Sequence, residues 1–305
     1  MSVSFYVQNK KKFLGYEPVL NVETALSLLD KELYSYNTGN IDINDLLLSP
    51  VSNYQCLIIG DGKDSSRGFE LFYDNKDKYY SVRVFTPSSR EDWLLALEYI
   101  KALAKKFDSK IISETGEEYT AENIDKFDYE RDILYGIEVI SSRVKGDEPT
   151  LYSIFGINRV VSFNQEMIDK IENSDSPIDT FSNMVKEIQY LDAYSANQRF
   201  FKNKEDGRIR GAYTLTQNTR TILPYKPSVE FENSDIVKNE DIAFWDIGLV
   251  TIDGDENDKN SYNVAGYVDY DDFIKNLPEN KYRFIDASYI MVEPLSKEEI
   301  LDLLK

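Results

Sequence analysis

The chain has 305 residues and a formal net charge of −19, and it contains no histidine and one cysteine. Without histidine, Ser-His-Asp catalysis, Cys-His catalysis and every histidine-containing zinc site are excluded, and one cysteine excludes an intramolecular disulfide. The acidic balance disfavours nucleic acid and anionic membranes as partners.

The composition is that of a folded protein. Hydrophobic residues make up 42% and charged residues 29%, so the chain can bury a core. No apolar run approaches the roughly 18 residues of a membrane span. The apolar stretch at the N-terminus is too short for a signal peptide, and its charges follow it. We therefore expect a cytoplasmic protein, with no metal site and no cofactor.

Strands and short helices are predicted over the first 86 residues. Residues 3–7 alternate apolar and polar, as in a strand. Asn21 can cap a helix that runs to about Tyr36. Residues 42–48 are predicted to form a short helix that ends before Pro50. Three further strands, the last two joined by a hairpin turn, are predicted at 54–59, 69–73 and 79–86.

The clearest predicted helix begins after Ser89, with Asp92 at the capping-box position. Its apolar residues follow helical spacing and are Trp93, Leu94, Leu97, Ile100 and Leu103. Beyond this helix, a strand is predicted to begin at Ile111, and residues 133–144 are predicted to form a longer strand.

A domain boundary is predicted in the polar segment 141–150, which carries Gly146 and Pro149. The chain would then consist of an N-terminal αβ module over residues 1–145 and a C-terminal αβ module over residues 146–305. The alternative interpretation is an ordinary loop inside one domain.

The second half alternates short strands with helices. Asn164 begins a short predicted helix, and Ser176 caps another that runs to about Tyr194. Ser296 and Glu299 form a predicted capping box for the last helix. A further helix is expected at 269–277, and strands are expected at 151–163, 199–204, 208–215, 219–223, 244–252, 262–268 and 283–292. The fold class predicted is α+β, with antiparallel or mixed sheets packed by helices.

The segments 69–103 and 244–277 repeat one order of elements. Each is expected to run strand, acidic turn, strand, helix. Two related modules would explain this similarity, and chance resemblance between common αβ building blocks would explain it equally well.

Three local motifs have both a chemical and a structural interpretation. The acidic segment 253–258 resembles a calcium loop but lacks the glycine and glutamate of an EF-hand, which favours a solvated hairpin turn. The segment 60–63 lacks Walker spacing, which favours a tight loop over a phosphate cradle. Cys56 lies in an apolar run and is expected to be buried and inert.

Local charge reversal gives the candidate site. Between residues 198 and 226, seven basic residues face two acidic ones, and aromatic residues are interleaved. Such strands could bind a small anion or single-stranded nucleic acid. The alternative is that they form cross-strand ion pairs with acidic strands. The candidate anion-binding residues are Arg199, Arg208, Arg210 and Arg220.

Three blocks of the sequence resemble a family of uncharacterised proteins, with a domain of unknown function, from streptococci and related Gram-positive bacteria. These blocks are 5–15, 221–233 and 284–290. The resemblance spans essentially the whole chain and implies a cytoplasmic bacterial protein. It implies nothing about activity, and it transfers no catalytic residues.

Three functions are compatible with the sequence. The leading one is a non-enzymatic binding protein that recognises another protein through Tyr-rich sheet edges, or a small anion. An exposed apolar sheet face would favour it. The second is a histidine-free hydrolase or transferase that uses carboxylates, Tyr or Lys, for which a deep pocket with shifted pKa values would be evidence. The third is an acidic immunity or mimic protein that blocks a basic partner.

Overall fold

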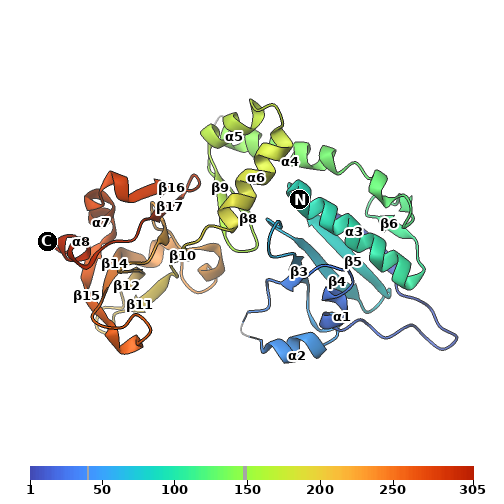
Figure 1. The fold of residues 1–305 in the computed structure, drawn as a ribbon, viewed down its shortest axis with the longest axis horizontal. Coiled ribbons are helices and arrows are strands. Elements are labelled where there is room, and N and C mark those ends of the chain that lie inside the picture. The colour runs from blue at the N-terminus through green and yellow to red at the C-terminus, as the bar shows by residue number, and fades with distance from the viewer. Residues whose placement is uncertain (40, 147–149) are drawn as a thin grey trace. The chain divides into compact units, whose positions relative to one another are not determined.

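A computed structural model describes residues 1–39, 41–146 and 150–305 (Figure 1). The chain divides into two compact units, unit 1 over Met1–Tyr190 and unit 2 over Leu191–Lys305. The predicted boundary at 145/146 therefore falls inside unit 1, where the helices that follow it pack on those that precede it. Residues 147–149 of the predicted linker lie outside the described residues.

Unit 1 is built on an antiparallel sheet of order β2-β3-β4-β5-β1-β6-β7. Alternation of buried side chains along these strands forms one apolar face, as predicted for residues 3–7 and for the 69–86 hairpin. The strands are β1 (Ser2–Gln8), β2 (Tyr34–Ser35), β3 (Leu57–Gly60), β4 (Phe69–Asp74), β5 (Tyr79–Phe85), β6 (Ile111–Ser113) and β7 (Glu118–Tyr119).

The long helix α3 (Arg90–Phe107) covers this sheet and contacts β1 and β5 (Figure 1). Its N-cap is Ser89, as predicted, and the Ser89 hydroxyl accepts from the Asp92 amide. Trp93 is fully buried, whereas Leu94 is 49% exposed and does not belong to the predicted apolar stripe. Unit 1 also contains α1 (Val22–Leu26), α2 (Ile43–Leu48) and the 3₁₀ turns η1 (Val51–Asn53) and η2 (Ile124–Lys126).

The strand predicted over residues 133–144 is wrong, because this segment lies in helix α4 (Tyr129–Val144). Ile133, Ile137, Ile140 and Val144 are buried at spacings of three and four, which places them on one helical face. Asp128 caps the helix by accepting from the Arg131 amide. The abundance of β-branched residues suggested a strand, but their period is helical.

Unit 1 ends with the hairpin β8 (Tyr152–Phe155) and β9 (Val160–Phe163), followed by α5 (Gln165–Glu172) and α6 (Pro177–Gln189). The short helix predicted from Asn164 is confirmed as α5, and Asn164 is its N-cap. Helix α6 ends at Gln189, before the predicted Tyr194, because Tyr194 and the next residue pair with residues 221 and 222 in a sheet of unit 2.

Unit 2 contains two mixed sheets, of order β11-β12-β14-β15 and β10-β13-β17-β16 (Figure 1). The strands are β10 (Tyr194–Ser195), β11 (Arg199–Lys202), β12 (Ile209–Thr216), β13 (Thr221–Pro224), β14 (Ile242–Ile252), β15 (Tyr262–Asp269), β16 (Tyr282–Phe284) and β17 (Tyr289–Val292). The helices are α7 (Tyr270–Asn276) and α8 (Lys297–Asp302), and the 3₁₀ turns are η3 (Phe231–Asn233), η4 (Asn239–Asp241), η5 (Lys259–Ser261) and η6 (Glu279–Lys281).

The core of unit 2 lies between one face of the β11-β12-β14-β15 sheet, the other sheet and the two helices. Tyr213, Leu215, Ile247 and Leu249 point into it from β12 and β14. They meet side chains from α7, α8, β13 and β17, namely Tyr270, Phe273, Ile300, Leu223 and Ile290. The opposite face of this sheet is therefore left to face away from the core.

Two further boundaries differ from prediction. Helix α1 ends at Leu26 instead of about Tyr36, because Tyr34 and Ser35 pair with β3. The predicted strand 283–292 is two strands, because Asp286 accepts from the amides of Ser288 and Tyr289 and turns the chain. The capping box of Ser296 and Glu299 at α8 is confirmed.

The predicted α+β class is confirmed. The repeated order of elements is also present, as β4-β5-α3 and β14-β15-α7. The two hairpins sit differently, however, because β5 lies inside its sheet and β15 lies at an edge. Among the described residues, no helix has the length and apolar character needed to cross a bilayer.

Candidate functional site

The arginines of the predicted anion site lie at separate places in unit 2. Arg199 and Arg210 belong to β11 and β12, and Arg220 precedes β13 in the other sheet. Three of the four pair with carboxylates, as Arg208–Asp206 at 2.7 Å, Arg210–Asp246 at 3.2 Å and Arg220–Glu293 at 2.9 Å. These ion pairs support the alternative interpretation, in which neighbouring carboxylates neutralise the basic strands.

One face of the β11-β12-β14-β15 sheet carries large apolar side chains in contact with solvent. Strand register places several residues on this face, and we define the exposed face by five of them: Phe201, Arg210, Phe244, Val264 and Tyr267. Its four apolar members are between 46% and 59% exposed. Clustered apolar side chains of this kind mark interaction surfaces more often than isolated ones do.

Arg210 organises the exposed face. Its guanidinium carbon lies 4.7 Å from the ring centroid of Phe201 and 4.8 Å from that of Tyr267. The guanidinium therefore contacts two aromatic rings, one from β11 and one from β15, in two cation–π interactions. This stack spans the full width of the sheet.

Asp246 forms an ion pair with the Arg210 guanidinium. The Arg210 Nη1 to Asp246 Oδ2 distance is 3.2 Å, and Asp246 is only 5% exposed. Burial raises the pKa of Asp246, and Arg210 opposes that shift. Gly248 leaves room for the Tyr267 ring, because a Cβ at residue 248 would lie 3.1 Å from Tyr267 Cε1.

These contacts restrain Phe201, Arg210 and Tyr267 in the free protein. A preorganised surface loses less conformational entropy on binding. Arg, Tyr and exposed aromatic rings are also the side chains that contribute most binding energy at protein interfaces. The arrangement is suited to recognition of another protein.

A second polar cluster lies in unit 1, on the loop between β3 and β4. Asp61 accepts from the amides of residues 63, 64 and 65, at 3.1, 2.9 and 2.9 Å. Asp92 accepts from the amides of residues 66, 67 and 68 and from the Ser89 hydroxyl. The amides of six successive residues thus already donate to carboxylates of the protein and are not free to bind a phosphate. The prediction that segment 60–63 forms a tight loop, and not a phosphate cradle, is confirmed.

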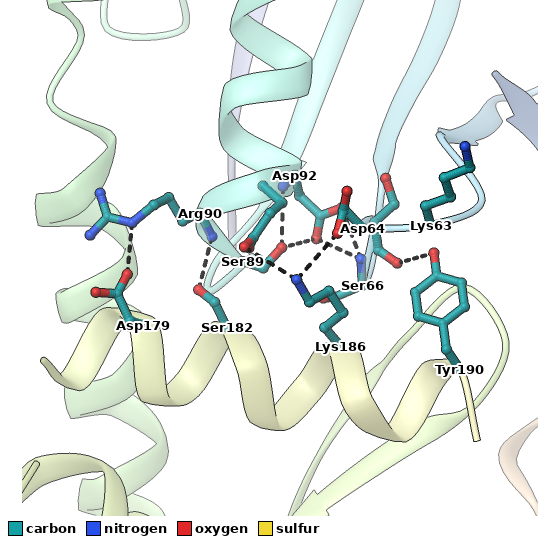
Figure 2. Close-up of polar contacts among 12 residues, drawn as sticks. Lys63, Asp64, Ser66, Ser89, Arg90, Asp92, Asp179, Ser182, Lys186 and Tyr190 are labelled. Atoms are coloured by element: carbon teal, nitrogen blue, oxygen red, sulfur yellow. Dashed lines mark hydrogen bonds and ion pairs between the residues drawn. The ribbon is translucent and has the colours of Figure 1, made fainter. Parts of the chain in front are cut away.

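Helix α6 holds this loop against the start of α3 (Figure 2). Tyr190 donates to the Ser65 carbonyl at 2.8 Å, and Lys186 pairs with Asp64 at 3.2 Å. The Arg90 amide donates to the Ser182 hydroxyl at 2.9 Å. Figure 2 shows Asp179, Ser182, Lys186 and Tyr190 on one side of α6, facing α3 and the loop. We assign this cluster a structural role.

The comparisons with known proteins identify a family. A family model described as a domain of unknown function, DUF4299, matches residues 2–303. The chain belongs to the DUF4299 family. No curated protein and no solved structure matches it.

The other chemistry-bearing groups are engaged locally. Cys56 is half-buried, and burial together with Glu70 raises the pKa of its thiol. In the acidic turn, Asp253 pairs with Lys297, and Asp255 accepts from the Asn257 amide. Within the described residues, no group of three or more Cys, Asp or Glu side chains is arranged to hold a metal ion.

Asp132 on α4 is a carboxyl with a shifted pKa near neutrality. Its Oδ1 accepts from the Thr86 hydroxyl at 2.8 Å, and burial raises its pKa to about 6. Because this pKa exceeds the ordinary 3.8 of an unfolded chain, the folded state binds the proton more tightly. Asp132 therefore favours folding at low pH, and this contribution is lost as pH rises through about 6.

Asp132→Asn removes that dependence while keeping an acceptor for Thr86. Relative to wild type, we expect the variant to gain about 1 kcal/mol in free energy of unfolding between pH 5 and pH 8, after allowance for partial exposure. Urea unfolding at the two pH values measures it, with the exposed Glu138→Gln on the same helix as control. A difference between variant and wild type that does not change with pH would refute the assignment.

Sequence reasoning found part of the exposed face and missed the rest. Arg210 was predicted as a site residue, but its partners Asp246 and Tyr267 were not. Tyr267 precedes Val268, which packs against the core, so strand alternation could have placed Tyr267 on the opposite face. Asp246 comes close to Arg210 through the parallel pairing of β12 with β14, which places residue 212 opposite residue 246. No pattern among neighbouring residues in the sequence indicates this pairing.

Proposed function

We propose that this DUF4299 protein binds another protein through the exposed face of unit 2. The observation that supports it is the stack of Phe201, Arg210 and Tyr267 across the sheet, held by a nearly buried carboxylate. A surface-exposed ring normally keeps its rotamer freedom, whereas here an ion pair restrains the arginine between both rings. Recognition explains why these apolar groups face solvent.

The alternative of a histidine-free enzyme has less support. Burial raises the pKa of the Cys56 thiol and of the Tyr190 phenol, so both stay protonated near neutral pH. Such shifts disfavour nucleophilic attack by either group. The exposed face offers binding energy without requiring an activated group.

We also infer that the protein acts in the cytoplasm of a bacterium, in the streptococcal lineage that its sequence blocks resemble. A single cysteine, half-buried in the structure, fits a reducing compartment.

The proposal is tested by affinity capture with two forms of the protein. Wild type and Phe201→Ala/Tyr267→Ala are used as bait in native lysate, and captured proteins are quantified by mass spectrometry. We expect a partner to be retained by wild type and reduced about tenfold or more with the double variant, the loss typical of two interface anchors. Leu94→Ala/Leu134→Ala, which removes exposed apolar groups from unit 1, is the matched control. Equal capture by all three forms would refute the proposal.

A further inference from the structure

Strand β11 lies at one edge of its sheet and has unpaired backbone groups on its outer side. It pairs with β12 in the register Arg199↔Ala212 and Phe201↔Arg210. The Asn203 amide donates to the Arg208 carbonyl at 2.8 Å in the same register. Hydrogen-bonded pairs alternate along an antiparallel ladder, so residues 199 and 201 bond to β12, and residue 203 bonds to Arg208 just before it. The amides and carbonyls of residues 200 and 202 therefore point outward, and no described residue bonds to them.

The same edge carries cations without acidic partners. Arg199 and Lys202 are exposed on β11, and the exposed Lys204 follows it. Among the described residues no ion pair involves these three side chains, whereas Arg208 and Arg210 are both paired. Natural edge strands often carry lysine to prevent unwanted pairing. Cations without acidic partners on an edge strand would also attract an acidic strand more than a basic one.

The cations have a defined pattern along the strand. Arg199 and Phe201 point to the exposed face, and Lys202 points to the other side, because side chains alternate. A strand added next to β11 would thus meet a cation, an aromatic ring and a cation opposite three of its positions. Acidic residues three apart, with an apolar residue between them, complement this pattern.

We propose that β11 accepts an extended acidic segment of a partner protein as an additional strand. This inference rests on the proposed function, because Phe201 belongs to both the edge and the exposed face. The net charge of −19 does not prevent it, since charges farther away than about 8 Å are screened at physiological ionic strength. Backbone hydrogen bonds supply affinity, and the two cations supply selectivity.

The test uses a short capped peptide centred on Glu-Val-Val-Glu, which fits both strand directions, and a Lys-Val-Val-Lys control. Binding is measured by fluorescence anisotropy to wild type, Lys202→Ala and Lys202→Pro. Proline at residue 202 removes an outward amide without breaking a bond to β12, whereas alanine removes only the charge. Amide hydrogen exchange is followed at residues 199–203 in wild type, with and without peptide.

We expect the acidic peptide to bind at least about tenfold more tightly than the basic one, and Lys202→Pro to bind about tenfold more weakly than Lys202→Ala. Exchange should slow at residues 200 and 202 and stay unchanged at 199 and 201. Equal binding by the proline and alanine variants, no slowing at 200 and 202, or no binding of the acidic peptide would overturn strand addition.

A second copy of the chain is the other occupant that the edge could take. A dimer in light scattering, together with slow amide hydrogen exchange at residues 200 and 202 in the absence of peptide, would show that a second copy pairs with β11. That result would overturn the proposal. Capture through Phe201 and Tyr267 is measured independently of the peptide. Failure of strand addition with intact capture would therefore leave the proposed function standing, and loss of capture would remove it.

Discussion

Replacing Asp92 by alanine should lower the free energy of unfolding of unit 1 by at least about 3 kcal/mol. The Asp92 carboxylate is fully buried and accepts from three loop amides and from the Ser89 hydroxyl. Alanine leaves these four donors buried and unpaired, and each unpaired donor costs about 1–3 kcal/mol. Water that enters the space left by the Asp92 side chain would bind some of these donors and so reduce the loss of stability. Urea unfolding monitored by tryptophan fluorescence measures the loss.

Asp128→Ala is the matched control for this variant. Asp128 also accepts from a helix amide, that of Arg131, but it is exposed. Its loss should cost about 1 kcal/mol, the value of an ordinary N-cap. If the two alanine variants lose equal stability, Asp92 does not organise the loop in the way its hydrogen bonds suggest.

Arg210→Ala should destabilise unit 2 by about 2–3 kcal/mol at pH 8, because it leaves the Asp246 carboxylate buried without its cation. Arg210 lowers the pKa of Asp246, so removing Arg210 raises that pKa further above its unfolded value. The folded variant therefore binds this proton more tightly than the unfolded chain does. The loss of stability should accordingly shrink as pH falls toward 5.

Two comparisons isolate this effect. Arg208→Ala breaks the exposed pair with Asp206 and should cost no more than about 0.5 kcal/mol. Asp246→Asn introduced together with Arg210→Ala removes the unpaired charge and should restore about half of the lost stability, and it should abolish the pH dependence that Arg210→Ala adds. Chemical unfolding of wild type, the two single arginine variants and the double variant at pH 5 and pH 8 measures these differences in stability. A deficit in Arg210→Ala that is equal at both pH values would contradict a charge-based origin.

Local rules were sufficient for much of the fold. The caps at Asn21, Ser89 and Ser296 were predicted because an N-cap depends only on residues within one turn of helix. The hairpin of β4 and β5 was likewise predicted from strand alternation and a polar turn. Segment 133–144 was mistaken for a strand because β-branched composition was given more weight than the helical period of its isoleucines.

The candidate site was less accessible to prediction. Charge reversal directed attention to residues 198–226, where anion binding and cross-strand ion pairs were the two interpretations. Whether Arg210 is free or neutralised depends on Asp246, which β12 meets only through a parallel pairing across 34 positions of sequence. The outward amides of β11 depend on ladder register, which a sequence pattern does not specify by itself.

The most direct test of the exposed face is site-specific photo-crosslinking in the native host. A photoreactive phenylalanine analogue is placed at Phe201, at Tyr267 and, as a control, at Leu134 on α4, which is 46% exposed in unit 1. Our account predicts one and the same partner protein crosslinked from positions 201 and 267, with no such adduct from position 134. Absence of any adduct from both positions of the exposed face, or an identical set of adducts from all three positions, would contradict it.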